Sequence, residues 1–578
     1  MSDPVVVRSV DGEAPAPGHL RVAAVQFGVG TDVDENLATC LRMIDAAAAE
    51  GAQVIVLPEF CNHVSWYDDR EHSRRMAVTL DGPFVGAIAA KAKEHNAYVM
   101  VNVVVARDDG RTTGTNVLCS PEGAVIADSD KQVLMGSERL HLDDAISAGP
   151  IIKTDVARFG MYSCMDGVIN ETPRGLALRG AQVLLNSLNS FALDEANLHI
   201  PVRAPENRVW IVAANKVGPL IPPGNIEQVS TGVGVPVERL HGAGESQIVA
   251  PDGTVVAQGP LTGEAVVVAD IDVAAADAKK RPDGTDVFAN RRPELYAALA
   301  DAPKGRQAPA GAEVLRTAVV QPAADGPDAI TAAAAAVAQA VAGGAELVVL
   351  PELFCFDGGV VDVDAAAAEA RATDAVTAIA AVAGSAHVVT SLPAGSAHEA
   401  VLIGADGIVA RQRQLHAVAR HGWVTELGDG LQVVELPWGR LALVVGDDAV
   451  YPETFRLAAL ADADVVALPF TVAESWELRT GLVERAAENR LNLVASTRPG
   501  PAGASVVIPL SGEFTLWSTE RTEPFNGVIS RPDPVLVDPS AEVTLVEVSP
   551  AQATNRMVSR GTDLVDGRPW QLIDAITS

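Results

Sequence analysis

Three side chains in the first half of the chain have types and positions that suit nucleophilic catalysis. Cys164 follows the short apolar run 159–162, which predicts a buried strand, and it precedes a turn and a predicted helix. A thiol at such a turn projects from the sheet and lies near helix N–H groups, and both effects favour a thiolate. Glu59 ends another apolar run and Lys131 follows a turn, so the three side chains can converge at the ends of separate strands.

The chemistry of these three groups is complementary. The Glu59 carboxylate can take the thiol proton, and the Lys131 ammonium and the Met165 N–H can hold the negative oxygen of a tetrahedral intermediate. After ammonia leaves, Glu59 can activate the water that cleaves the thioester. These steps require no metal and no organic cofactor, so we predict neither. Alone, the cysteine is more often a core residue and the lysine more often a surface residue, and the glutamate is as often a solvated carboxylate as a functional one, so the prediction depends on their joint order.

The cysteine pattern argues against a disulfide framework. The chain has five cysteines, and none forms a CxxC pair. We therefore expect neither a disulfide scaffold nor a cysteine zinc site, and a reducing compartment is the simplest interpretation. Cys61 and Cys355 closely follow glutamates that end apolar runs, and we interpret both as packing residues. His63 and His199 are interpreted as structural or exposed, because the thiol already has a base.

Composition and charge restrict the partners and the compartment. The 578 residues are 48% hydrophobic and 20% charged, enough for several domains with a large core. The net charge of −31 would repel phosphates and argues against a nucleic-acid or anionic-membrane partner. The N-terminus lacks the pattern of a signal peptide, and the alanine-rich run 330–343 predicts a helix rather than a membrane span. We expect a cytoplasmic protein with a small-molecule partner.

The chain contains two copies of one sequence pattern. RVAAVQ, GAQVIVLPEF and RAPENR return in the same order as RTAVVQ, GAELVVLPELF and RAAENR. We predict a flexible arm at 1–19, a catalytic domain at 20–300, a linker rich in Pro, Ala and Gly at 301–313, and a second copy with a C-terminal tail at 314–578. In each copy, β-branched apolar runs alternate with alanine-rich stretches, which is typical of a layered α/β domain. Strands that are apolar on both faces favour a sandwich covered by helices.

The sequence around Cys164 resembles that of the nitrilase superfamily, also called carbon–nitrogen hydrolases. In that family a cysteine stands in a C-x-D-x-x-x-x-E-x-x-R context. Here Asp166, Glu171 and Arg174 match this context, although Asn170 replaces the usual proline. The family also has a glutamate after an apolar strand and a lysine between the glutamate and the cysteine.

The resemblance implies a fold and a set of roles. The fold is α/β, a four-layer αββα sandwich. The roles are general base for Glu59, oxyanion-stabilising cation for Lys131 and nucleophile for Cys164. The resemblance also implies that Glu138 is a second glutamate that positions the lysine.

The second copy lacks the nucleophile. The spacing of the matching ETxR segments places Gly446 opposite Cys164, and Gln414 is the best match to Lys131, while Glu352 persists. A glutamate without a thiol or an ammonium cannot run this mechanism, so we predict an inactive copy. We hypothesise that the two copies pack as an intramolecular pseudo-dimer, from which a homo-oligomer can be built.

The residues near the nucleophile bear on the substrate. The C-M-D sequence resembles amidases and carbamoylases more than nitrilases, although Gly167 and Val168 replace arginines frequent in carbamoylases. The loops 62–68 and 186–191 are expected to line the pocket, with a core or dimer-contact role as an equal alternative for their aromatic residues. The predicted substrate-binding residues are Trp66, Tyr67, Met165, Asn189 and Phe191.

Several functions fit these features. The first is a cysteine-dependent hydrolase that releases ammonia from a small amide or N-carbamoyl compound. A nitrile hydrolase or an acyltransferase can use the same thioester, the latter with an acceptor other than water. A non-catalytic binding or scaffold protein would suit the second copy, but the complete set of residues in the first copy argues against it for the whole chain.

Overall fold

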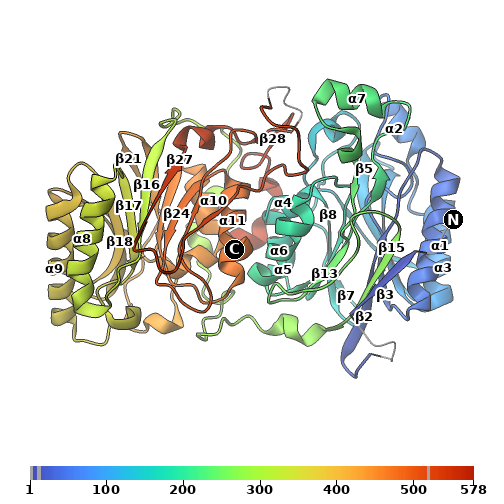
Figure 1. The fold of residues 1–578 in the computed structure, drawn as a ribbon. Coiled ribbons are helices and arrows are strands. Elements are labelled where there is room, and N and C mark those ends of the chain that lie inside the picture. The colour runs from blue at the N-terminus through green and yellow to red at the C-terminus, as the bar shows by residue number, and fades with distance from the viewer. Residues whose placement is uncertain (1–3, 10–14, 517–520) are drawn as a thin grey trace. The chain divides into compact units, whose positions relative to one another are not determined.

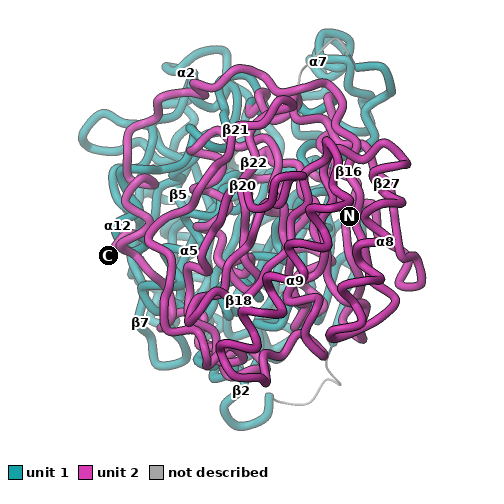
Figure 2. Tube along the Cα trace, turned by 90° about the vertical axis from the view of Figure 1, so that its left-hand side faces the viewer, with its two compact units in different colours: residues 1–278, 513–530, 557–576 teal, residues 279–512, 531–556, 577–578 magenta. Residues whose placement is uncertain are grey.

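The computed structural model describes residues 4–9, 15–516 and 521–578. They form two compact units, coloured separately in Figure 2. Unit 1 comprises Met1–Ala278, Glu513–Ser530 and Met557–Ile576, and unit 2 comprises Lys279–Gly512, Arg531–Arg556 and Thr577–Ser578. Each unit is therefore discontinuous in sequence, because two segments that follow most of the second copy belong to unit 1.

Two sheets form the centre of unit 1. In the first sheet, parallel neighbours β2, β3 and β4 are extended by antiparallel strands. Its order is β1 (Val5–Arg8), β15 (Ala265–Asp272), β2 (His19–Gln26), β3 (Val54–Val56), β4 (Tyr98–Ala106), β5 (Thr112–Cys119) and β6 (Val125–Asp130). The order of the second sheet is β14 (Val255–Gln258), β13 (Gln247–Val249), β10 (Trp210–Ala214), β9 (Val183–Ser187), β8 (Arg158–Ser163) and β7 (Ile152–Lys153).

Helices cover the outer faces of both sheets (Figure 1). Helices α1 (Val33–Ala49) and α3 (Pro83–His95) pack on the first sheet in one apolar cluster. Helices α5 (Glu171–Leu178) and α6 (Ile200–Asn207) pack on the second. Asp32 caps α1 by accepting hydrogen bonds from the backbone N–H groups of Asp34 and Glu35.

A separate apolar cluster fills the space between the two sheets of unit 1. It joins residues of β2, β3 and β4 to residues of β8, β9 and β10, among them Val22, Met161 and Leu185, all at most 1% exposed. Both faces of these central strands are buried, as their continuous apolar runs predict. The layer order helix, sheet, sheet, helix confirms the αββα sandwich.

Unit 2 repeats this architecture. Its sheets have the orders β20-β19-β18-β17-β16-β27 and β21-β22-β23-β24-β25-β26. Helices α8 (Ala329–Ala342) and α9 (Ala365–Ala383) pack on the first sheet, and α10 (Pro452–Leu460) and α11 (Leu482–Asn489) lie on the second. Helix α8 confirms the helix predicted from the alanine-rich run. The strands of unit 2 are β16 (Leu315–Val320), β17 (Leu347–Glu352), β18 (His387–Ala394), β19 (Ala397–Gly404), β20 (Gly407–Arg413), β21 (Val433–Leu436), β22 (Gly439–Leu443), β23 (Val465–Pro469), β24 (Asn492–Ser496), β25 (Val506–Ile508), β26 (Val535–Leu536) and β27 (Val543–Val548).

The N-terminal arm differs in part from the prediction. Val5–Arg8 forms strand β1, which pairs in parallel with β15 from Val5 opposite Ala265 to Arg8 opposite Val268. The flexible arm predicted at 1–19 is therefore wrong for these residues, because their three consecutive valines extend the edge of the first sheet. Residues 1–3 and 10–14 of the predicted arm lie outside the described residues.

The segment 301–313 contains no helix or strand. Within unit 2, Arg306 pairs with Asp464 at 2.6 Å, and the N–H groups of Gln307 and Ala308 donate to Asp462.

In the part of the chain that the structure describes, no helix combines the length and the apolar character needed to cross a bilayer.

The inter-sheet core predicts a stability difference between two leucines. Leu185→Ala should lower the free energy of unfolding by about 2–5 kcal/mol, because it removes a fully buried side chain from a packed interior. Leu261→Ala, at a side chain 46% exposed, should lower it by less than about 0.5 kcal/mol. Urea denaturation of both variants measures the difference, and equal losses would contradict this account of the core.

Candidate active site

The nucleophile candidate sits at a strained turn. Strand β8 ends at Ser163, and helix α4 (Met165–Val168) begins directly after Cys164. Cys164 has φ +46°, a region that costs a non-glycine residue about 1–3 kcal/mol. Its N–H donates to the Ser187 carbonyl oxygen at 3.0 Å and to Asn186 Oδ1 at 3.3 Å, both on the neighbouring strand β9. These bonds hold the turn in its strained conformation.

The structure brings the other three predicted catalytic residues together in one buried ion cluster. Lys131 Nζ lies 2.9 Å from Glu59 Oε1 and 2.9 Å from Glu138 Oε2. Lys131 is 1% exposed and Glu59 is fully buried. Glu138 Oε2 also accepts a hydrogen bond from the Met135 N–H at 2.8 Å, which fixes the loop after Lys131. One ammonium therefore bridges two carboxylates from different segments.

Asp166 and Arg203 connect the nucleophile turn to its surroundings. Asp166 Oδ1 accepts from the N–H groups of Gln132 and Val133 at 3.0 and 2.7 Å, and its Oδ2 accepts from the Ser163 N–H at 3.1 Å. The Asp166 carboxylate thus ties the lysine loop to the cysteine turn. Arg203 donates to the carbonyl oxygens of α4, to Gly167 at 2.7 Å and to Val168 at 2.9 Å. These contacts give a structural role to the Asp of the C-M-D sequence and to the first Arg of the RAPENR segment.

Burial dominates the electrostatics of the site. It raises the pKa of Cys164 well above the ordinary value, the Glu59 charge raises it further, and Lys131 opposes both. Burial also raises the pKa of Glu59 to about 7, against the opposing charge of Lys131. For Lys131, burial alone would lower the pKa, but Glu138 and Glu59 raise it well above the ordinary value. At neutral pH the cysteine is therefore a neutral thiol beside a carboxylate poised to accept its proton. The raised pKa of Cys164 runs against the thiolate expected from the turn, because desolvation and the Glu59 charge outweigh the Lys131 charge.

A large cavity opens in front of Cys164. It has a volume of about 750 Å³, and all of its lining residues belong to unit 1. Four of the five predicted substrate-binding residues line it: Trp66, Met165, Asn189 and Phe191. Tyr67 does not, which corrects the prediction. Its ring packs instead at 5.1 Å from the His63 ring and 4.9 Å from the His141 ring, because the buried loop turns it away from the cavity.

Two polar residues that line the cavity bear on its chemistry. Glu195 Oε1 lies 3.8 Å from Cys164 Sγ, and Glu195 is 4% exposed. Asn189 Oδ1 is buried and has no hydrogen-bond partner among the residues that the structure describes. A buried acceptor without a partner is costly, so Asn189 is suited to receive a donor from a bound molecule.

The sequence analysis missed a second buried cation. Lys216 Nζ donates to the Phe60 carbonyl oxygen at 3.3 Å, next to Glu59, and Phe60 has φ +52°. Burial lowers the pKa of Lys216 to about 8, and its charge in turn lowers the pKa of Glu59. In unit 2, Arg498 donates to the carbonyl oxygens of Glu352 and Leu353, both at 2.6 Å. Aligning the two copies beyond their shared RAxENR segments would have paired these two cations.

Segments 513–530 and 557–576 of unit 1 complete the site. Asp194 Oδ2 accepts from the N–H groups of Ile529 and Ser530 at 2.8 and 2.6 Å. His199 Nε2 lies 3.0 Å from Ser530 Oγ. The Thr562 hydroxyl accepts from the Gly136 N–H at 2.8 Å and so holds the loop that carries Glu138. Sequence patterns could not show this, because the contacting residues lie hundreds of positions apart.

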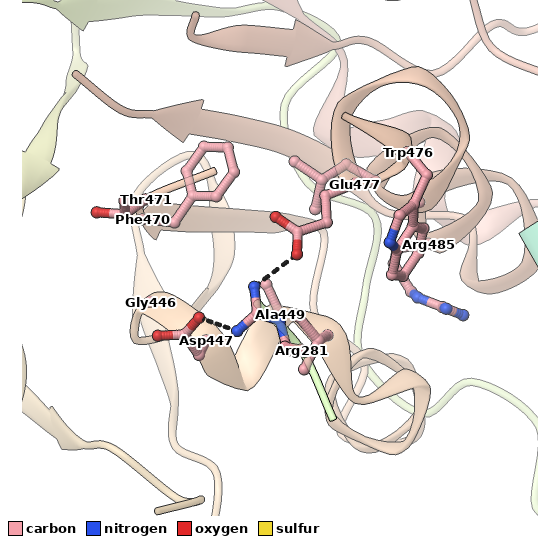
Figure 3. A pocket seen from close by; sticks show the side chains of 12 residues that line it. Arg281, Gly446, Asp447, Ala449, Phe470, Thr471, Trp476, Glu477 and Arg485 are labelled. Atoms are coloured by element: carbon pink, nitrogen blue, oxygen red, sulfur yellow. Dashed lines mark hydrogen bonds and ion pairs between the residues drawn. The ribbon is translucent and has the colours of Figure 1, made fainter. Parts of the chain in front are cut away.

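The corresponding pocket of unit 2 is filled by the protein itself. Only about 10 Å³ remains, and Arg281 occupies the centre between Asp447 and Glu477 (Figure 3). The Arg281 guanidinium pairs with both carboxylates, with Glu477 at 2.5 Å. Glu477 occupies the position that Glu195 has in the first copy, so an internal guanidinium blocks the space where a substrate would lie.

Glu352 has also changed partners. Arg420 Nη2 donates to Glu352 Oε2 at 2.7 Å, whereas Gln414 at the predicted lysine position donates to the His416 carbonyl oxygen. Burial alone would raise the pKa of Glu352, but Arg420 lowers it below its usual range. Gly446 keeps the left-handed turn at φ +49°, and a Cβ there would lie 2.2 Å from Glu352 Oε1. The turn remains, but the space for a sulfur atom does not.

Among the residues that the structure describes, two groups of side chains have donor atoms close enough to hold a metal ion. One is Glu352, His398 and His421, and the other is Asp45, Glu94 and His95. In the first, Arg420 already pairs with Glu352 and donates to His421 Nε2. In the second, Lys91 lies 2.7 Å from Asp45 and 3.0 Å from Glu94. An internal cation already neutralises the carboxylates of both groups.

Comparison with known proteins identifies a family and several relatives. The carbon–nitrogen hydrolase family model matches residues 21–281 and 316–523. A nitrilase of Pyrococcus abyssi is 27% identical over 281 residues, which cover 48% of this chain and 99% of that protein. An N-carbamoylputrescine amidase of Solanum tuberosum is 26% identical over 305 residues, covering 48% and 94%. Among solved structures, an amidase variant from Nesterenkonia sp. AN1 in complex with butyramide has a TM-score of 0.40 at 20% identity, covering 49% of this chain and 98% of that one.

Lys216 predicts a shift in the pH profile of turnover. If Glu59 must be ionised to accept the thiol proton, turnover of an amide should fall as the pH drops through about 7. Lys216→Met removes a positive charge that lowers the pKa of Glu59. The fall in turnover on the acidic side of the pH profile, the acidic limb, should therefore move to higher pH, whereas Lys216→Arg should move it less. Lys153→Met, at an exposed lysine of β7, is the control. A limb that stays in place in Lys216→Met would contradict this role.

Because the space at Gly446 is filled, we predict that one substitution cannot restore a nucleophile to the second copy. Gly446→Cys places a side chain against Glu352 in a left-handed turn, so it should lower the free energy of unfolding by roughly 2–4 kcal/mol. Gly430→Cys is the matched control, because a Cβ there meets nothing within 4 Å. Thermal unfolding of both variants measures the difference. A fully stable Gly446→Cys variant with a reactive new thiol would show that the space is open.

Proposed function

The chain belongs to the carbon–nitrogen hydrolase family, and on this premise we propose that it hydrolyses an amide or N-carbamoyl compound through a thioester on Cys164. The observation that carries this proposal is the buried Glu59–Lys131–Glu138 cluster in the unit whose Cys164 lines a large cavity. The family acts on C–N bonds other than peptide bonds, and the arrangement of these four residues supports cysteine chemistry at such a bond.

In the acylation step, Glu59 takes the thiol proton as Cys164 Sγ attacks the carbonyl carbon. The carbonyl electron pair moves to the oxygen, where the Lys131 ammonium and the Met165 N–H at the start of α4 stabilise the negative charge. The C–N bond then breaks, and ammonia leaves with the proton that Glu59 returns. A Glu59 pKa of about 7 suits both halves of this proton transfer near neutral pH.

In the deacylation step, Glu59 takes a proton from water, and the resulting hydroxide attacks the thioester carbon. The same two donors hold the oxyanion again. The C–S bond breaks, the sulfur regains the proton from Glu59, and the acid leaves. Glu138 acts through Lys131: its carboxylate, 2.9 Å from Nζ, keeps the ammonium charged and directed at the oxyanion position.

Asn189 favours an amide over a nitrile substrate. Its Oδ1 is a buried acceptor of the cavity and can receive a hydrogen bond from a substrate –NH2 group. Amides and N-carbamoyl compounds carry that group, whereas a nitrile nitrogen has no hydrogen to donate. A nitrile would leave this acceptor unsatisfied, at a cost of roughly 1–3 kcal/mol.

The second copy is proposed to be inactive. Gly446 has no nucleophile, Arg281 fills its pocket, and Arg420 holds Glu352 ionised in a pair. A paired carboxylate with a lowered pKa is a poor base.

The proposed function is tested by ammonia release from amides, N-carbamoyl compounds, ureas and nitriles. Cys164→Ala should reduce kcat/KM for an accepted amide by at least about 10⁴-fold, because it removes the atom that forms the covalent bond. Cys61→Ala, at another buried cysteine, should retain activity within about 10-fold. Comparable release by wild type and Cys164→Ala would refute the nucleophile assignment.

A further inference from the structure

The cavity in front of Cys164 is far larger than an amide group needs. Its volume of about 750 Å³ lies in the range of pockets that bury drug-sized ligands. Apolar side chains form much of its lining, among them Met135, Leu220, Val229, Leu240, Leu516 and Ile529. Since the proposed leaving group is only ammonia, the rest of the substrate must occupy this space.

One part of the apolar wall is an insertion found only in the first copy. In unit 1, β10 (Trp210–Ala214) is followed by β13 (Gln247–Val249) after a long excursion that contains α7 (Ile226–Val233). In unit 2 the equivalent strands are β24 and β25, and the chain passes from Ser496 to Val506 without a helix. The αββα sandwich therefore does not require the excursion.

The other part of the wall is an insertion found only in the second copy. Strand β25 ends at Ile508, and the next strand of its sheet, β26, begins at Val535. In unit 1 the equivalent connection passes directly from Val249 to Val255. The extra residues include 513–530, which belong to unit 1 rather than to unit 2. This insertion contributes to the copy that carries Cys164.

The two insertions meet in one apolar cluster at the cavity. Ile221 and Leu240 from the first insertion pack with Leu516 and Phe525 from the second, and all four are at most 8% exposed. The Phe525 ring lies 6.0 Å from the Phe191 ring in an edge-to-face contact. Asp194, adjacent to Glu195, anchors the second insertion through the N–H groups of residues 529 and 530.

From this convergence we infer that the natural substrate carries a bulky apolar acyl group, arylalkyl or long alkyl, bound by a wall made of residues 220–240 together with Leu516, Phe525 and Ile529. This inference rests on the proposed hydrolase function and specifies its substrate class. Neither insertion has a counterpart in the other copy, yet both supply apolar surface to the copy that carries Cys164. An acyl group that fills the wall removes its own apolar surface and that of the cavity from water, and a small acyl group does not.

The test is a series of primary amides of increasing size, assayed with the full chain by ammonia release. Acetamide, butyramide, hexanamide and 4-phenylbutyramide differ in apolar surface but not in the reacting group. We expect kcat/KM to rise roughly fourfold per added methylene, and 4-phenylbutyramide to exceed acetamide by at least about 100-fold.

A filled cavity should reduce this preference. Val229→Trp places a large ring in the wall and should lower kcat/KM for 4-phenylbutyramide at least about 10-fold more than for acetamide. Val255→Trp makes the same change at a strand residue that is 38% exposed and does not line the cavity, and it should leave both values unchanged.

The possible outcomes distinguish a failure of this inference from a failure of the proposed hydrolase function. Turnover of all four amides without a preference for size would overturn the inference alone, and so would an equal loss for both amides in Val229→Trp. If no member of the series released ammonia, the inference would fail, and the hydrolase function would fail with it only if N-carbamoyl compounds, ureas and nitriles released none either. These assays of the wild-type protein are sufficient for both decisions should Val229→Trp not fold.

Discussion

The first copy depends on one buried ammonium held between two carboxylates. Taking an ion out of water costs several kcal/mol even after relaxation, so a lysine that is 1% exposed persists only with close partners. Glu59 and Glu138 provide them at 2.9 Å each, and the second carboxylate leaves the cluster with a net negative charge. That excess, together with burial, explains why the pKa values of Glu59 and Cys164 are both raised. A base near neutrality and a thiol that keeps its proton until substrate arrives follow from the same arrangement.

The second copy shows that the scaffold and the chemistry are separable. Cys164 and Gly446 have nearly the same left-handed turn, at φ +46° and +49°, so the backbone that presents the nucleophile survives without it. Its charges have been rearranged: Arg420 neutralises Glu352, and Arg281 fills the pocket between Asp447 and Glu477. Glu352, Asp447 and Glu477 each have a guanidinium partner, which suits a packed interior and leaves none of the three poised for proton transfer.

The sequence allowed much of this to be predicted, because the relevant signals are local. Continuous apolar runs, without the alternation of apolar and polar residues, identified the strands of the sandwich. The alanine-rich run identified α8. The repeat identified the second copy, and the strand ends together with the family resemblance identified Glu59 and Glu138, which the structure clusters around Lys131. Long-range consequences were not predictable. Asp194 holding residues 529 and 530, and Thr562 holding the loop of Glu138, join segments with no shared pattern. The thiol state of Cys164 depends on desolvation, which no spacing reveals. Tyr67 faces a histidine cluster for reasons of packing, and Val5–Arg8 became a strand because a sheet edge was available.

The most direct test of the account is the identity of the acylated residue. Wild-type protein is mixed with an accepted amide, quenched in acid during turnover and measured by intact mass, followed by peptide mapping. The account predicts an added mass equal to the acyl group less one hydrogen, located on Cys164, with nothing added to Cys164→Ala. Ammonia release with no adduct on Cys164, or with the adduct on another residue, would contradict it.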